Sequence, residues 1–431
     1  MGGEWKAAPL EDCMSAIIDY RGKTPNKTAS GVPLVTAKVV KGGRILPTDE
    51  FIADNDFKSW MRRGMPAPGD IVMTTEAPLG EIAQLGSERV ALAQRLITLR
   101  GKPEVLDNTF LKFLMQSSDI QEQLYARSTG TTVLGIKQSE LRKVKLTLPP
   151  ILEQRAIAHI LGTLDDKIEL NRKMNETLEA MARALFNSWF VDFEPVRSKV
   201  EGRNTGLPKE IADLFPDSFD DSDLGEVPKG WNISPLPEVI EVNPLRSLSK
   251  GQAAPYLDMA NVPTNTARAN EVVEREFSSG SKFKNGDTLL ARITPCLENG
   301  KTAYVDFLEV NQVGWGSTEF IVLRPKPPLP AEFAYFLARD ESFRTFAISN
   351  MTGTSGRQRV PADCFYNFIM ATPSPSIAAV FGYQVSAMMQ RIKANDEESL
   401  TLATQRDALL PKLLSGGLSI KNAERFVMET V

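Results

Sequence analysis

The feature that most constrains the fold of this chain is a repeat that spans most of its 431 residues. When the sequence is shifted along itself by roughly 220 positions, short motifs coincide. The matching motifs are Trp5 with Trp231, Gly69-Asp70 with Gly286-Asp287, Pro78 with Pro295, Leu99-Arg100 with Leu323-Arg324, and Thr129-Gly130-Thr131 with Thr352-Gly353-Thr354. The offset varies between motifs, as loop insertions would make it. A duplication of this length predicts two similarly folded units related by a pseudo-two-fold axis.

Composition places the chain among ordinary globular proteins. Hydrophobic residues make up 42% of it and charged residues 24%, and its length is enough for two or three domains. No apolar run is long enough to span a membrane, and the first residues lack the layout of a secretory signal. Three scattered cysteines, Cys13, Cys296 and Cys364, predict neither a disulfide framework nor a zinc site. We therefore expect a cytoplasmic protein.

The net charge of −4 argues against a strongly basic surface. Much of the acidity lies in residues 191–228, which hold ten acidic and four basic residues. The rest of the chain is close to neutral. If the protein binds nucleic acid, we expect local loops to make the contacts and partner proteins to supply part of the phosphate contact.

Residue patterns divide the chain into six segments. Each repeat begins with short β-rich runs, turns and a helical stretch, and ends in a long helical segment. An acidic segment rich in proline and glycine connects the two repeats. The predicted segments are a first mixed domain (1–150), a central helix (151–191), a linker (192–229), a second mixed domain (230–375), a distal helix (376–415) and a C-terminal tail (416–431). The expected fold class is α+β, with two similar domains joined by two long helices.

The two helical segments carry the clearest periodicity. Apolar positions recur in alternating steps of three and four, and positions in the first helix recur 224 residues later in the second (164 to 388, for example). The residues expected to pair are Leu164, Ile168, Asn171 and Leu178 in the first helix, and Met388, Ile392, Asn395 and Leu402 in the second. Such a seam predicts helix-on-helix packing, which a pseudo-dyad would make antiparallel. The alternative is that each helix packs on its own domain.

Asn171 and Asn395 are matching polar residues in this apolar seam. A lone asparagine at such a position lowers stability but fixes register. A dyad through the middle of the pair would bring the two together; otherwise each is solvated or bonded to backbone. A helix of about 38 residues would be roughly 57 Å long. That length exceeds one turn of B-DNA, about 34–36 Å, so the pair could hold two domains at a fixed separation.

Catalytic motifs are scarce in this sequence. His159 is the single histidine, so no histidine cluster can form. Gly300-Lys301-Thr302 resembles the end of a phosphate-binding loop, but Pro295 stands where that loop requires glycine. The metalloprotease and dinucleotide motifs are absent. We therefore expect a non-catalytic binder or scaffold with no metal site and no cofactor of its own.

Polar loops at corresponding places in both repeats are better candidates for a functional site. Arginine suits guanine edges, glutamine suits adenine, and hydroxyls and lysine suit phosphates or bases. The candidate residues are Arg21, Lys23, Thr24, Thr129 and Thr131 in the first repeat, and Arg292, Lys301, Thr354, Ser355, Arg357, Gln358 and Arg359 in the second. The alternative for each loop is an ordinary solvated turn. Duplex DNA, which itself has two-fold geometry, is the target that a pseudo-two-fold protein most often fits.

Several segments resemble the specificity subunits of Type I restriction-modification systems. They are residues 149–164 (PPILEQRAIAHILGTL), 291–302 (ARITPCLENGKT), 316–325 (GSTEFIVLRP), 351–361 (MTGTSGRQRVP) and 404–415 (TQRDALLPKLLS). The resemblance spans essentially the whole chain and is stronger in the second domain than in the first.

This resemblance implies two target-recognition domains, each recognising one half of a split sequence in double-stranded DNA. It implies that the two helices form an antiparallel ruler and dock two modification subunits, which bind S-adenosylmethionine and methylate adenine. It also implies restriction subunits that use ATP and Mg²⁺ for translocation and cleavage. Two other interpretations stay open: a coiled-coil scaffold that does not bind DNA, and a self-contained nuclease or ATPase with unrecognised motifs.

Overall fold

The structure is a computed structural model that describes residues 5–21, 24–354 and 356–428. The chain divides into two compact units. The first unit comprises Met1–Glu169 and Ser399–Val431, and the second comprises Leu170–Glu398. Two long helices, α6 (Ile151–Phe186) and α12 (Pro375–Leu414), each contribute one part to either unit. A π-helical turn, η1 (Asn187–Val191), continues α6 to the residue where the sequence pattern ends.

The first unit is built on a four-stranded antiparallel sheet of order β2-β10-β7-β8. Its strands are β2 (Met14–Asp19), β10 (Leu96–Gly101), β7 (Ile71–Thr75) and β8 (Leu79–Gln84). A second sheet joins β6 (Phe51–Ile52), β3 (Val32–Val35) and β9 (Ala91–Leu92). There are also two short strand pairs. One joins β1 (Lys6–Pro9) to β11 (Lys145–Leu148), and the other joins β4 (Val40–Lys41) to β5 (Arg44–Ile45). The shorter helices are α1 (Leu10–Cys13), α2 (Asp54–Trp60), α3 (Asn108–Gln116), α4 (Ser118–Ala126), α5 (Gln138–Leu141) and α13 (Ile420–Met428).

The second unit repeats this plan with a four-stranded antiparallel sheet of order β15-β22-β19-β20. Its strands are β15 (Ile240–Val242), β22 (Phe320–Pro325), β19 (Thr288–Ala291) and β20 (Thr302–Tyr304). A second sheet has the order β17 (Val273–Glu276), β16 (Ala253–Leu257), β21 (Gly314–Gly316) and β18 (Ser281–Phe283), and β14 (Asn232–Pro235) pairs with β23 (Ile369–Thr372). The shorter helices are α9 (Leu236–Val239), α10 (Phe333–Arg339), α11 (Glu341–Ser349) and the 3-10 turn η2 (Ala362–Asn367).

The sheet β2-β10-β7-β8 and the sheet β15-β22-β19-β20 are each buried on both faces. In the first unit Ile71 and Met73 of β7 pack with the helical side, whereas Val72 between them packs with the core around β3 and β9. In the second unit Leu290 packs with the helical side, and Leu289 packs with residues of the sheet β17-β16-β21-β18. Successive residues of a strand point to opposite faces. The central strands are therefore nearly continuous apolar runs, as a sheet covered on both sides requires.

An ion pair explains two of the repeated sequence motifs. In the first unit Arg100 Nε lies 2.7 Å from Asp70 Oδ1, and in the second Arg324 Nη1 lies 2.8 Å from Asp287 Oδ1. Both aspartates are buried. A buried carboxylate is tolerated when it is paired and hydrogen-bonded. The Gly-Asp and Leu-Arg motifs recur because the same buried pair joins two neighbouring strands in each repeat.

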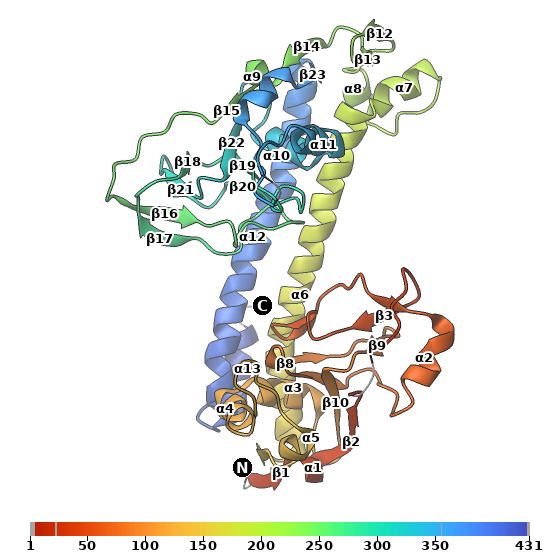
Figure 1. Ribbon diagram of the computed structural model, residues 1–431, viewed down its shortest axis with the longest axis vertical. Helices are drawn as coiled ribbons and strands as arrows, with labels where there is room; N and C mark the ends of the chain where they lie inside the picture. The colour runs from red at the N-terminus through yellow and green to blue at the C-terminus, as the bar shows by residue number, and fades with distance from the viewer. Residues whose placement is uncertain (1–4, 22–23, 355, 429–431) are drawn as a thin grey trace. The chain divides into compact units, whose positions relative to one another are not determined.

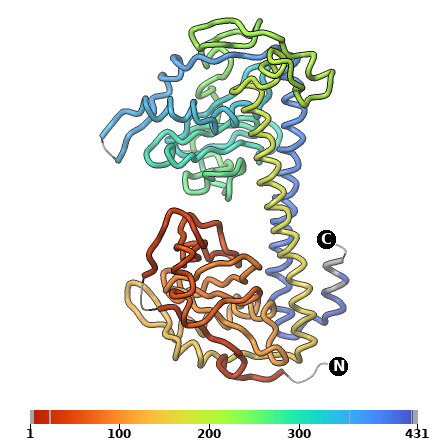
Figure 2. The backbone as a smooth tube through the Cα atoms, turned by 90° about the vertical axis from the view of Figure 1, so that its right-hand side faces the viewer, coloured from red at the N-terminus to blue at the C-terminus, as the bar shows by residue number. Residues whose placement is uncertain are grey.

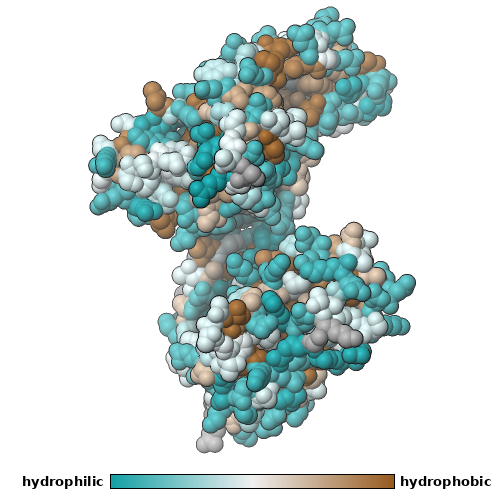
Figure 3. All heavy atoms as spheres, in the orientation of Figure 1, coloured by the Kyte–Doolittle hydropathy of each residue, from teal (hydrophilic) through white to brown (hydrophobic). Residues whose placement is uncertain are grey.

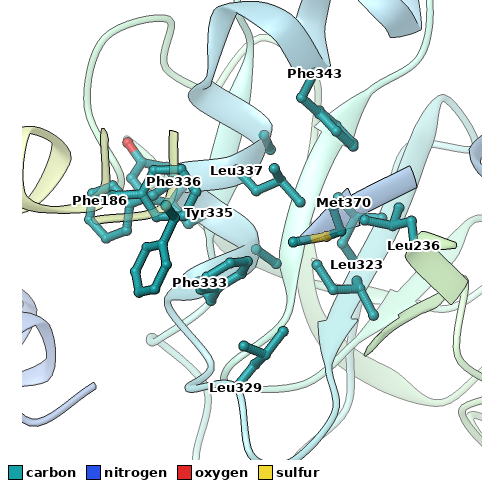
Figure 4. Close-up of a cluster of buried hydrophobic side chains, with 14 of the residues drawn as sticks. Phe186, Leu236, Leu323, Leu329, Phe333, Tyr335, Phe336, Leu337, Phe343 and Met370 are labelled. Atoms are coloured by element: carbon teal, nitrogen blue, oxygen red, sulfur yellow. The ribbon is translucent and has the colours of Figure 1, made fainter. Parts of the chain in front are cut away.

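The core of the second unit is rich in aromatic side chains (Figure 4). Phe186 comes from the end of α6, Phe333 and Phe336 come from α10, and Phe381 comes from α12. The ring centroids of Phe186 and Phe333 are 5.1 Å apart with the rings nearly edge to face. This is a favoured geometry for aromatic pairs, and it joins the long helices of this unit to its sheet.

Within each unit, part of α6 lies beside part of α12 (Figures 1 and 2). In the first unit Leu161 and Leu164 share a core with Leu402 and Leu409, and an ion pair of 2.7 Å joins Asp165 Oδ1 to Arg406 Nη1. In this unit α6 begins and α12 ends, and Figure 1 shows the two segments running in opposite directions. The packing in the first unit is therefore antiparallel.

The second unit contains the two asparagines of the seam. Asn171 Nδ2 donates to the Asn395 carbonyl at 3.3 Å and to Glu398 Oε2 at 2.7 Å. Asn395 Nδ2 in turn donates to Asn175 Oδ1 at 2.8 Å. Asn171 and Asn395 are both almost fully buried, so these contacts replace lost hydration. The order of the partners again makes the two helix segments antiparallel.

The acidic segment between the repeats is more structured than its composition suggests. It contains α7 (Glu194–Val200), α8 (Lys209–Ala212) and a hairpin of β12 (Phe219–Ser222) and β13 (Gly225–Pro228). Phe215 is buried, and its ring lies 5.0 Å from that of Trp189. A few apolar residues therefore anchor a segment whose charged residues stay in solvent. Among the described residues, no helix is both long and apolar enough to cross a membrane.

Candidate nucleic-acid interface

Each unit carries one short loop closed by a pair of backbone hydrogen bonds, which we name a finger. The first finger is residues 129–135, in which Thr129 and Gly135 donate to each other's carbonyls at 2.8 and 2.9 Å. The second finger is residues 352–359, in which Thr352 and Arg359 do the same at 2.9 and 2.8 Å. Of the predicted site residues, Ser355 in this finger and Lys23 lie outside the described residues. The two fingers are the structural counterparts of each other.

A glycine in each finger accounts for the repeated Thr-Gly-Thr motif. Gly130 has a φ of +124° and Gly353 a φ of +123°, a backbone conformation that favours glycine. A Cβ on Gly130 would lie 2.1 Å from the Val133 carbonyl oxygen, and one on Gly353 would lie 3.1 Å from the Arg357 carbonyl oxygen. The close approach of the Val133 carbonyl therefore excludes any residue larger than glycine at position 130.

Both fingers are fixed to the end of the corresponding sheet strand. At the end of β7, Thr75 donates its N–H to the Arg95 carbonyl, and its own carbonyl accepts from Ile136, just after the first finger. After β19, the backbone N–H of Arg292 donates to the Glu319 carbonyl. The Arg292 carbonyl accepts from the N–H of Val360, which lies just after the second finger. A loop held on a rigid sheet presents its side chains in a fixed geometry, which recognition requires.

The tips of the two fingers differ in chemistry. The first finger contains no charged side chain, and it exposes Val133 and Leu134 to 53% and 42%. Its hydroxyl residues Thr129 and Thr131 are also exposed. The second finger exposes Thr354 and Arg357, with Gln358 partly exposed. Loops closed in the same way therefore present an apolar tip in one unit and a cationic tip in the other.

An ion pair lies at the base of each finger, with its charges reversed between the units. Arg95 Nε lies 3.0 Å from Glu76 Oε1 in the first unit, and Arg359 Nη2 lies 2.6 Å from Glu319 Oε1 in the second. Arg95 and Glu319 hold equivalent backbone positions. Arg95 directly precedes β10 and its carbonyl accepts from Thr75 N–H, and Glu319 directly precedes β22 and its carbonyl accepts from Arg292 N–H. The hydrogen bond to Glu319 raises the pKa of the Arg359 guanidinium. Arg359 is thus engaged within the protein and is not an open cation.

The loop after β2 approaches the first finger. Arg21 Nη2 lies 2.6 Å from Asp19 Oδ2, and Arg21 Nη1 donates to the Ile136 carbonyl at 3.2 Å. Thr24 Oγ1 donates to Gln94 Oε1 at 3.3 Å. A cleft of about 610 Å³ opens beside this loop, and Arg62 and Arg63 line it together with Trp60, Tyr20 and Arg21. The structure therefore brings Arg21 to the finger and adds two arginines that sequence patterns did not indicate.

Lys301 does not belong to the finger. Its Nζ donates to the carbonyls of Met259 and Ala260 at 2.5 and 3.3 Å, so it ties the turn before β20 to the loop after β16. Arg292 lies under the second finger, with its Nε buried and without a hydrogen-bond partner among the described residues. Of the cations predicted in the second repeat, Arg357 is the one whose position leaves it open to a ligand.

The distribution of side chains over the visible surface adds little to this assignment. On the face drawn in Figure 3, hydrophilic side chains predominate and hydrophobic ones occur in small groups. Within the described residues, no group of three or more His, Cys, Asp or Glu side chains could hold a metal ion. The fingers and the cleft beside the first of them are the places where the repeated architecture gathers recognition chemistry.

Comparison with known proteins adds independent information. Residues 23–180 match the family described as "Type I restriction modification DNA specificity domain". The specificity subunit of the Type I restriction enzyme MjaIX from Methanocaldococcus jannaschii is 27% identical over 368 residues, which is 82% of this chain and 78% of that protein. The chain is thus similar, over residues 23–180 and over most of its length respectively, to that specificity domain and to a Type I specificity subunit.

A second relative and a solved structure are also similar to this chain. The HindI specificity subunit from Haemophilus influenzae is 23% identical over 378 residues, covering 76% of this chain and 81% of that one. The crystal structure of the specificity subunit from M. genitalium superposes with a TM-score of 0.55 at 16% identity, covering 95% of this chain and 96% of that one. The predicted α+β fold with two domains and paired helices is confirmed. These relatives are named specificity subunits, and the hypothesis of a scaffold that does not bind DNA is not supported.

Proposed function

We propose that this chain recognises a bipartite sequence in double-stranded DNA, with one finger of each unit at one half-site. The observation that carries the proposal is the pair of equivalent fingers, each fixed to the end of the same strand in a repeated sheet. A fixed loop that carries hydroxyl, guanidinium and amide groups suits base edges and phosphates. The similarity to a DNA specificity domain supports the same conclusion.

The division of labour along the chain follows from this proposal. Residues 1–150 and 230–375 act as the two target-recognition domains, residues 192–229 as the linker and residues 416–431 as the C-terminal tail. The helices at 151–191 and 376–415 set the separation of the half-sites. The helix-pairing residues are those of the seam, of which Asn171 and Asn395 fix the register.

The partners of the chain supply the chemistry. Two modification subunits, which bind S-adenosylmethionine, dock on the chain and methylate adenine at the target. Restriction subunits, which use ATP and Mg²⁺, join the complex for cleavage. The chain itself then needs no cofactor, and the complex acts on DNA in the cytoplasm.

Mapping methylated adenines in cells that carry this chain with its modification subunits tests the proposal. The expected result is one motif made of two half-sites separated by a spacer of constant length. The purified complex should bind that duplex more tightly than a duplex with scrambled half-sites. A complex that binds both duplexes equally would overturn the proposal and restore the scaffold hypothesis.

A further inference from the structure

The two fingers share a closing pair of backbone hydrogen bonds and a glycine at positive φ, but they carry different side chains, and the proposed function does not explain this difference. Building on that function, we infer that the first finger recognises thymine through its methyl group in the major groove. Val133 and Leu134 supply the apolar contact. The second finger recognises its half-site by hydrogen bonds from Arg357 and Gln358.

The exposure of the first tip is the first observation in favour. Val133 and Leu134 are adjacent in sequence, and 53% and 42% of their surfaces are exposed. Single exposed apolar residues are common on proteins. Here, however, two of them occupy the tip of a loop closed by two backbone hydrogen bonds and a glycine at φ +124°. The loop therefore holds apolar groups in solvent at a fixed position, where a ligand can bury them.

The lack of a cation within the first finger is the second observation. Arg95 pairs with Glu76 at 3.0 Å, and Arg21 pairs with Asp19 at 2.6 Å. The finger itself carries threonine hydroxyls and no charge. It cannot offer the bidentate arginine contact that guanine favours. Apolar contact with the thymine methyl is one direct way to distinguish a base in the major groove, and Val133 and Leu134 are the apolar side chains of this finger.

The second finger provides the internal comparison. Arg357 is exposed, and it makes no ion pair with any other described residue. Gln358 follows it, and its carbonyl accepts from Thr294 at 3.0 Å, which fixes the backbone beneath the tip. An arginine and a glutamine side by side offer contacts to guanine and adenine. The loop is therefore present in both repeats, but its side chains in the two repeats suit different groups on the bases.

The test uses the complex with its modification subunits and the duplex that it methylates. Replacing Arg357 and Gln358 by alanine identifies the half-site of the second unit as the half whose sequence relaxes. Each thymine in the other half-site is then replaced by deoxyuridine, which lacks only the methyl group. Affinity should fall by about 4-fold at one or two positions, the value for burying one methyl group.

Two variants then connect this loss to the finger. In Leu134→Asn or Val133→Ser, deoxyuridine should no longer reduce affinity at those positions. The matched control is Leu224→Asn, because Leu224 is 45% exposed in the turn between β12 and β13. This control should keep the full deoxyuridine effect.

The outcomes separate the inference from the proposed function. A first half-site without thymine, or one insensitive to deoxyuridine throughout, would overturn the inference while specific binding persists. An undiminished deoxyuridine effect in both finger variants would overturn it as well. Failure of the unaltered complex to prefer its own methylated duplex would instead refute the proposed function.

Discussion

Arg359 and Glu319 form a two-point ion pair at the base of the second finger. Arg359 Nη2 lies 2.6 Å from Glu319 Oε1, and Arg359 Nε lies 2.9 Å from both carboxylate oxygens. Glu319 occupies the backbone position that Arg95 holds in the first unit. The pair therefore aligns the end of the finger with the start of β22, and it neutralises an arginine that the sequence alone presents as a DNA contact.

Glu319→Gln should release this arginine toward DNA. The ion pair is solvent-exposed on its arginine side, so its loss should change the stability of the protein little. Removing the negative charge and freeing Arg359 should strengthen binding to non-specific duplex and steepen the slope of log K against log salt by about one. Binding titrations at several salt concentrations measure the slope. Glu309→Gln, on the loop between β20 and β21, is the charge-matched control. An unchanged slope in Glu319→Gln would show that Arg359 does not face DNA.

Gly130→Ala should distort the first finger. The new Cβ would meet the Val133 carbonyl oxygen at 2.1 Å, and the backbone has a φ of +124°. Backbone strain of this kind costs about 1–3 kcal/mol. Thermal unfolding measures the loss of stability, and methylation mapping should show a relaxed first half-site. Gly206→Ala is the control, because Gly206 has a φ of +72° but no atom near its would-be Cβ. An equal effect of both substitutions would rule out crowding in the finger.

Two aspartates of the second unit make its stability depend on pH. Arg268 Nε lies 3.0 Å from Asp306 Oδ2, and Arg268 Nη1 lies 3.2 Å from Asp396 Oδ2. Burial raises the pKa of both carboxyl groups above the ordinary value of 3.8, in spite of the arginine. The folded state then holds these protons more tightly than the unfolded chain does. Tighter proton binding by the folded state therefore stabilises the unit fully below pH 3.8, the ordinary pKa of the carboxyl groups. This stabilisation is lost as the pH rises through the raised pKa values that the two groups have in the folded state.

Asp306→Asn isolates this contribution, because the amide cannot ionise. As the pH rises from about 4 through the folded pKa, the free energy of unfolding of the unaltered protein should fall relative to that of the variant. Urea unfolding of both proteins across this range measures the difference. A difference that shifts in favour of the unaltered protein as the pH rises would contradict the expected sign.

Cysteine reactivity offers a probe of the second finger. Burial raises the pKa of Cys13 and Cys364, whereas Cys296 is partly exposed. Cys296 also follows Thr294, whose N–H donates to the Gln358 carbonyl of the finger at 3.0 Å. Because the thiolate is the reactive form, iodoacetamide should modify Cys296 first. Mass spectrometry should show that target duplex slows this modification and that scrambled duplex does not. Equal rates with both duplexes would place Cys296 away from bound DNA.

The repeat in the sequence predicts much of this architecture because it reflects shared contacts. Asp70 and Asp287 recur since each is the buried partner of an arginine in the next strand. The glycines of the fingers recur since each lies at positive φ. The long helices follow from periodicity, which depends on neighbouring residues in the chain.

The site was harder to predict because its contacts join residues far apart in sequence. Lys301 is engaged by carbonyls of Met259 and Ala260, and Arg359 by Glu319, which no local pattern indicates. Val133 and Leu134 were missed because apolar residues are expected in a core. Their place at the tip of a finger becomes visible only when the loop is seen closed by Thr129 and Gly135.

Exchange of the finger tips tests whether each finger recognises one half-site. Residues 353–358 are replaced by residues 130–134 in the complete chain, and methylated adenines are mapped in cells that contain the modification subunits. The second half of the methylated motif should change, while the first half and the spacer stay the same. An unchanged motif, or a change in both halves, would contradict the assignment of one finger to each half-site.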